Sequence, residues 1–114
     1  MPIYALSTGP GVSGVAVIRL SGKGTIEVIK KISGKTLPKA RVATIRKFYK
    51  SDNKDLIDEG ILIWFPGPES YTGEDMAEFH VHGSKAVVDA LHESLSKIEG
   101  CRLAEPGEFT KIAF

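Results

Sequence analysis

The stretch that decides the fold is Gly9-Pro10-Gly11-Val12-Ser13-Gly14-Val15-Ala16-Val17-Ile18-Arg19-Leu20. Its first half has the glycine spacing of the dinucleotide-binding fingerprint and follows a short apolar run, Ile3–Leu6, that predicts a strand. A dinucleotide site needs a helix N-terminus directly behind the glycines to hold the pyrophosphate. Residues 15–20 are too rich in β-branched side chains to form that helix. We therefore predict a strand, a loop and a second strand, and we reject a Rossmann site.

A second glycine motif, Gly34-Lys35-Thr36, resembles the end of a phosphate-binding loop. That loop requires a glycine five positions before Gly34, where this chain has Ile29. The preceding residues have a helical pattern instead, because Ile26, Ile29 and Ile32 recur at helical spacing. We interpret Gly34 as a helix stop followed by a surface loop, so the sequence shows no means of binding GTP.

The middle of the chain predicts further strands. Two β-rich segments, Val42–Tyr49 and Leu56–Phe65, flank the turn formers Ser51-Asp52-Asn53, and this order predicts a hairpin. From Ala77 to His82 apolar and polar residues alternate, which is the period of a strand with one apolar face.

The last part of the chain predicts a helix, a short strand and the start of another helix. Ser84 is a suitable N-cap, and Gly100 closes the helix that follows. Its buried stripe consists of Val87, Val88, Leu91, Leu95 and Ile98. Residues 101–104 predict a strand and residues 109–114 begin a helix. Because strands and helices interleave without strict alternation, we expect an α+β fold with a mixed β-sheet and two to three helices.

Composition limits the classes of function. Fifteen Lys and Arg against fourteen Asp and Glu give a net charge of +1, so no overall field draws the chain to nucleic acid. The single cysteine, Cys101, excludes an intrachain disulfide and a cysteine zinc cluster. No run reaches the roughly 18 apolar residues of a membrane span, and the first residues lack a signal-peptide pattern. We therefore expect an unprocessed cytoplasmic chain without membrane contact.

The polar face of the strand at 77–82 holds the candidate binding residues. Glu78, His80 and His82 share that face, and zinc accepts such a set, but this pattern also occurs on exposed strands and we assign no metal site. No nucleophile or second base is tied to either histidine, so we assign no catalytic residue.

Glu78 and Arg19 each have two interpretations. The Glu78 carboxylate can accept two parallel hydrogen bonds from the amino group and ring N–H of a pterin or guanine, or it is a solvated or salt-bridged glutamate. Arg19 is either a surface charge on an edge strand or an anchor for an anionic or carbonyl-bearing ligand. Sequence periodicity alone does not choose between these interpretations.

Three segments, at residues 7–22, 66–83 and 106–114, carry motifs that go beyond generic patterns, and those of the second and third segments are highly specific. These motifs are Val17-Ile18-Arg19-Leu20-Ser21-Gly22, Ser70-Tyr71-Thr72-Gly73-Glu74-Asp75 and Pro106-Gly107-Glu108-Phe109-Thr110. In this combination they resemble the amino-terminal domain of the MnmE (TrmE) family of tRNA modification GTPases. The resemblance covers essentially the whole chain in order.

The resemblance implies a tetrahydrofolate-binding fold like that of the glycine-cleavage aminomethyltransferase. It implies that residues 1–114 form a single folate-binding and dimerisation domain, with 5-formyltetrahydrofolate or a related reduced folate as cofactor. The folate-contacting arginine and glutamate of the family fall on Arg19 and Glu78. A third, basic contact falls just beyond Phe114.

The same resemblance implies a longer parent protein. Members of the family continue into a helical domain and a GTPase domain, and the latter accounts for GTP, magnesium and potassium. They form a homodimer and act with the flavoprotein MnmG (GidA) on tRNA, where they add a carboxymethylaminomethyl group at C5 of the wobble uridine. This chain departs from the family at Ile112, commonly arginine, and at Val12-Ser13, frequently Arg-Gly. These departures weaken the expectations for the terminal helix and for anion binding by the first loop.

Two other hypotheses stay open at this stage. One is a stand-alone folate-dependent one-carbon transferase that uses His80 or His82 for proton transfer beside the pterin. The other is a dimerisation platform that has lost its affinity for folate.

Overall fold

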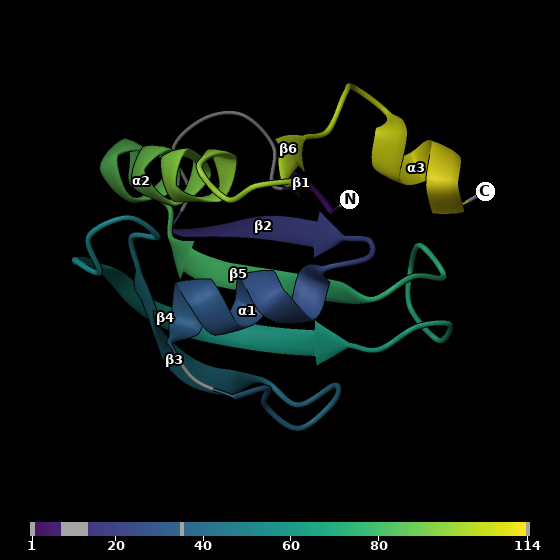
Figure 1. Ribbon diagram of the computed structural model, residues 1–114, viewed down its shortest axis with the longest axis horizontal. Coiled ribbons are helices and arrows are strands. Elements are labelled where there is room, and N and C mark those ends of the chain that lie inside the picture. Colours follow the sequence, from purple (N-terminus) through teal and green to yellow (C-terminus); the bar gives the residue numbers. More distant parts are fainter. Residues whose placement is uncertain (1, 8–13, 35, 114) are drawn as a thin grey trace.

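The computed structural model describes residues 2–7, 14–34 and 36–113. Its elements are β1 (Ile3–Leu6), β2 (Val15–Ser21), α1 (Thr25–Ser33), β3 (Thr44–Tyr49), β4 (Leu56–Phe65), β5 (Met76–His82), α2 (Lys85–Ser96), β6 (Arg102–Leu103) and α3 (Glu108–Ala113) (Figure 1). The strands form a six-stranded sheet in the order β3-β4-β5-β2-β1-β6. Only the β1–β6 pair is parallel within these residues. The predicted α+β architecture with a mixed sheet is therefore confirmed, and the aminomethyltransferase-like assignment stays a prediction.

Strand β2 stands where the dinucleotide fingerprint requires a helix. It runs antiparallel to β1 on one side and to β5 on the other, in the middle of the sheet. Most of the glycine stretch, residues 8–13, lies outside the described residues. The predicted strand at residues 15–20 is therefore confirmed, and it takes the place of the helix on which a Rossmann site depends.

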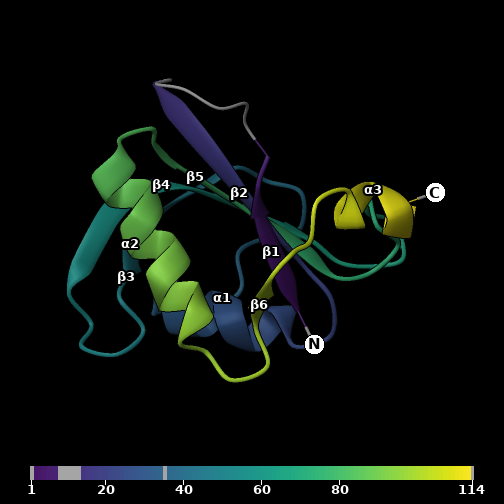
Figure 2. The same cartoon turned by 90° about the horizontal axis from the view of Figure 1, so that it is seen from above.

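The apolar core lies between the sheet and the helices α1 and α2. Ile18 of β2, Phe79 of β5, Ile29 of α1 and Leu91 of α2 are fully buried in it. The two helices lie on the same side of the sheet, and α3 lies apart from them (Figure 2). Because side chains alternate along a strand, the residues between these core positions, including Arg19, face the opposite side of the sheet. We call this side the open face.

Helix α1 ends as its sequence predicts. Gly34 adopts the left-handed conformation at φ 66°, and its N–H donates to the carbonyl of Lys30 at 2.8 Å. This is a glycine C-cap, which glycine supplies without steric cost. The interpretation of Gly34 as a helix stop is confirmed, while Lys35 lies outside the described residues.

Helix α2 begins as predicted and ends earlier than predicted. The hydroxyl of Ser84 accepts a hydrogen bond from the Val87 N–H at 3.3 Å, the usual N-cap contact. The helix stops at Ser96, so the predicted extension to Gly100 is wrong. The N–H of Ile98 donates instead to the carbonyl of Leu95, three residues back, so Ile98 reaches the core from a tighter turn.

The hairpin predicted in the middle of the chain is confirmed. Strands β3 and β4 pair antiparallel from Thr44↔Leu62 to Tyr49↔Leu56, with a register shift between Phe48 and Tyr49. Strand β4 pairs in turn with β5, which places β5 between β4 and β2. Among the described helices, none is long and apolar enough to cross a bilayer.

Candidate functional site

Arg19 and Glu78 meet at the centre of the open face. They are directly opposite each other in the register of β2 and β5, where side chains of neighbouring strands lie within contact distance. Arg19 Nε donates to Glu78 Oε2 at 2.9 Å, although the two residues are 59 positions apart in the chain. The structure therefore brings together both residues that the sequence singled out.

Glu78 is a well-buried carboxylate with two partners. Its side chain is only 15% exposed, and its second oxygen, Oε1, lies 3.0 Å from Nε2 of His80. Burial raises the pKa of Glu78, but the hydrogen bonds from His80 and Arg19 outweigh it and leave the pKa below its ordinary value. Glu78 is therefore an anion at neutral pH, and each oxygen keeps a further lone pair for a ligand.

The loop between β4 and β5 places an aromatic ring beside Arg19. Thr72 in this loop contacts Ser21 of β2, with 2.7 Å between their buried hydroxyl oxygens. Asp75 accepts a hydrogen bond from the Gly67 N–H at 2.9 Å, which closes the base of the loop. The loop presents Tyr71, whose ring centroid lies 5.5 Å from Cζ of Arg19, within the range of a cation–π contact.

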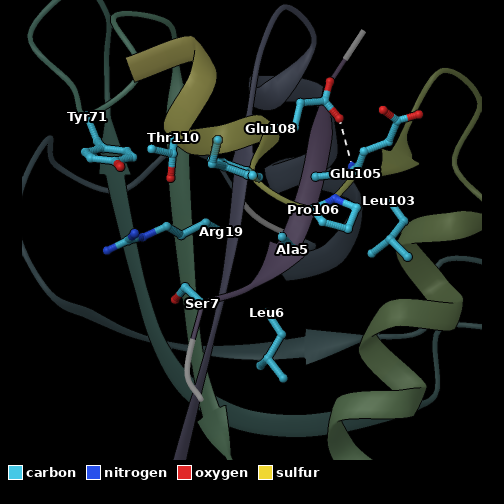
Figure 3. Close-up of a pocket in the computed structure, with 13 residues that line it drawn as sticks. Ala5, Leu6, Ser7, Arg19, Tyr71, Leu103, Glu105, Pro106, Glu108 and Thr110 are labelled. Carbon is cyan, nitrogen blue, oxygen red and sulfur yellow. Dashed lines mark hydrogen bonds between the residues drawn. The ribbon is translucent and has the colours of Figure 1, made fainter. Parts of the chain in front are cut away.

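A cavity of about 490 Å³ opens beside these residues. Its lining comes from the end of β1, from β2, from the Tyr71 loop and from the segment that leads into α3: Ala5, Leu6, Ser7, Arg19, Tyr71 and residues 103–110. Figure 3 shows Tyr71 and Thr110 on one side of Arg19 and Ser7 on the other. Arg19 lines this cavity and donates to Glu78 on β5, which is not one of the lining residues.

The far wall of the cavity is held by a carboxylate clamp. Glu108, the first residue of α3, pairs with the guanidinium of Arg102 through both of its oxygens. It also accepts a hydrogen bond from the N–H of Glu105 at 2.9 Å. The hydrogen bond from Arg102 is the main cause that lowers the pKa of Glu108 to about 2. These contacts tie α3 to β6.

The two histidines of β5 have different partners. His80 contacts Glu78, whereas Nδ1 of His82 lies 2.9 Å from a carboxylate oxygen of Asp58. The backbone N–H of His82 also donates to Asp58, at 2.8 Å. Within the described ranges, no group of three His, Cys, Asp or Glu side chains is arranged to hold a metal ion.

Sequence reasoning assigned no role to several residues that line the cavity. Tyr71 and Thr110 lie within the quoted motifs, and Ser7 lies just before the glycine stretch. For Tyr71, the sequence offered one signal, an aromatic residue within a polar loop. The structure shows that its side chain is exposed, and exposed aromatic side chains often contact ligands. Ser7 and Thr110 carried no comparable signal.

Comparison with known proteins gives the same family as the three motifs that line this cavity. The family described as "GTP-binding protein TrmE N-terminus" matches residues 2–114.

The chain belongs to this family.

Similar proteins include the tRNA modification GTPase MnmE of Pelagibacter ubique, which is 69% identical over 114 residues, 100% of this chain and 26% of the relative. The MnmE of Phenylobacterium zucineum is 51% identical over 98% of this chain and 24% of its own length. A mitochondrial 5-taurinomethyluridine tRNA synthase subunit of Danio rerio is 46% identical over 98% of this chain and 22% of its own length. The TrmE family chain thus spans about a quarter of the length of these relatives.

Proposed function

We propose that this chain is the part of a tRNA modification GTPase that binds a reduced folate, such as 5-formyltetrahydrofolate. The observation that carries the proposal is that residues from all three family segments line the same cavity. Arg19 from the first family segment, Tyr71 from the second and residues 106–110 from the third all line one cavity. Its volume of about 490 Å³ lies within the usual size range of small-molecule sites.

The chemistry of the site suits a pterin. An ionised carboxylate such as Glu78 recognises two adjacent N–H donors, as offered by the amino group and ring N–H of a pterin. Arg19 donates to Glu78 through Nε, so its two terminal nitrogens can serve a carbonyl or carboxylate of the ligand. The Tyr71 ring adds a flat apolar wall.

In this proposal the chain positions a one-carbon donor and carries no catalytic residue itself. The relatives' names, which describe tRNA modification GTPases, support a parent protein of that activity. In that parent, GTP, magnesium and potassium belong to a separate GTPase domain. We further propose that the protein acts as a cytoplasmic homodimer with an MnmG-type flavoprotein on the tRNA wobble uridine.

Calorimetric titration of 5-formyltetrahydrofolate into the full-length protein tests the folate site. We expect Glu78→Gln and Arg19→Gln each to weaken binding by about 10- to 100-fold, because each removes a charge-assisted hydrogen bond. Asp58→Asn is the matched control, because Asp58 is a similarly buried carboxylate whose partner is His82. Absence of binding, or binding that Glu78→Gln leaves unchanged, would sink the proposed site.

A further inference from the structure

His80 lies next to Glu78 and contacts its carboxylate. The two residues lie two positions apart on β5, so their side chains share the open face. Nε2 of His80 lies 3.0 Å from Oε1 of Glu78, and the His80 side chain is 28% exposed. His80 is therefore part of the polar cluster on this face.

The carboxylate of Glu78 is held from both ends. Arg19 donates to Oε2 and His80 contacts Oε1, so one hydrogen bond to each oxygen fixes both the position and the plane of the group. A carboxylate offers about four acceptor positions, of which these contacts use two. The remaining lone pairs are thereby set in one orientation, which is what recognition of two parallel donors requires.

We propose that His80 is a positioning residue of the folate site: its Nε2–H holds Oε1 of Glu78 and fixes the orientation in which that carboxylate meets a pterin. The inference rests on the proposed function, because it assumes that Glu78 is the ligand's acceptor. It assigns His80 a role in binding and none in proton transfer to the substrate.

The contact also determines the form of the imidazole ring. Oε1 of an ionised carboxylate is only an acceptor, so a neutral His80 must carry its proton on Nε2 to bond with it. The opposite tautomer would place two lone pairs against each other. The geometry thus predicts the Nε2–H tautomer in the absence of any ligand.

Truncating His80 removes little packing from the core. Its ring borders a second cavity of about 330 Å³ on the open face, which is also lined by Glu59, Ile61 and His82. Loss of this ring therefore tests the hydrogen bond more than the fold. His82 is a natural control, because it lies on the same face of the same strand and contacts Asp58 instead.

The first test needs no ligand and uses the chain itself. Nitrogen-15 NMR of the imidazole rings above pH 8 reports the tautomer of each histidine. We expect the Nε2–H form for His80, and we expect Glu78→Gln to remove this preference. A His80 ring in the Nδ1–H form, or a preference that survives Glu78→Gln, would overturn the inference.

The second test is a folate titration of the full-length protein. We expect His80→Ala to weaken binding by about tenfold without a comparable change in melting temperature, and His80→Gln to restore it, because the glutamine amide reaches the same point with an N–H. His82→Ala should change nothing. Unchanged affinity in His80→Ala, or a failure of His80→Gln to rescue, overturns the inference. If the unaltered protein does not bind folate, the proposed function is wrong, and the positioning role of His80 is then wrong as well.

Discussion

At the scale of single residues, Gly60 shows how closely β4 and β5 approach beside the site. A Cβ at this position would lie 2.0 Å from the backbone carbonyl oxygen of His80 and 3.2 Å from the Phe48 ring. Real Cβ atoms do not approach a backbone oxygen that closely, so any side chain here must push the strands apart. The absence of a side chain at Gly60 therefore lets β5 hold Glu78 and His80 where they are.

We predict that Gly60→Ala destabilises the protein by about 1–3 kcal/mol, the usual cost of overpacking a tightly packed position. Urea unfolding measures the change. Gly14→Ala is the matched control, because a Cβ at Gly14 would meet no atom within 4 Å among the described residues. We expect the control to stay within about 0.5 kcal/mol of the unaltered chain. Similar losses in both variants would contradict the role given to Gly60.

At the scale of elements, α3 depends on its contacts more than on its own sequence. It has six residues, Glu108–Ala113, and none of them is buried. A helix this short is not stable in isolation. The Glu108 clamp on Arg102 and on the Glu105 N–H therefore holds α3 as a wall of the cavity.

We predict that Glu108→Gln loosens α3 while the core stays intact. Amide hydrogen exchange should become faster at residues 108–113 and remain unchanged in β2 and β5, because the clamp touches neither strand. Folate binding should weaken, since residues 108–110 line the cavity. Faster exchange throughout the sheet, or no change in α3, would show that the clamp has a different role.

The same clamp has a predictable pH dependence. Its folded-state pKa of about 2 lies below the ordinary glutamate value of 4.5, so the unfolded chain takes up the proton first as the pH falls. The stabilisation by Glu108 is therefore complete above pH 4.5 and is lost as the pH falls through about 2. NMR signals of α3 amides should follow this course, and the Glu108→Gln variant should lack it.

At the scale of the whole molecule, the two faces of the sheet differ. Helices α1 and α2 cover one face, while the open face carries the site together with exposed apolar side chains. Ile45 is 70% exposed and Val15 is 53% exposed. Single exposed apolar side chains are normal on a protein surface, so the expectation of a dimer comes from the proposed function.

We predict that light scattering gives the mass of two chains at micromolar concentration. Glu78→Gln should keep that mass while binding folate more weakly, because the partners of Glu78 lie within its own chain. A monomer at every concentration would contradict the proposed homodimer. A dimer that never binds folate would favour the dimerisation-platform hypothesis.

Local patterns in the sequence determined most of the elements. Alternation predicted β5, helical spacing predicted α1, and turn formers predicted the β3–β4 hairpin, because each depends on neighbours close in the chain. Reliance on local spacing also explains why the end of α2 was predicted too late. Ile98 is buried in a tight turn after the helix, and its position in the chain still fits helical spacing. The three motifs also determined the family, which the comparison confirms.

Only the tertiary structure decided how the site is assembled. The pairing of β2 with β5 sets Arg19 opposite Glu78, and this register depends on packing between residues 59 positions apart. It also decided that His80, and not His82, contacts Glu78. The sequence by itself named Arg19 and Glu78, because charges within apolar strands are visible locally. Their meeting beside Tyr71 and α3 follows from long-range contacts, which no local pattern contains.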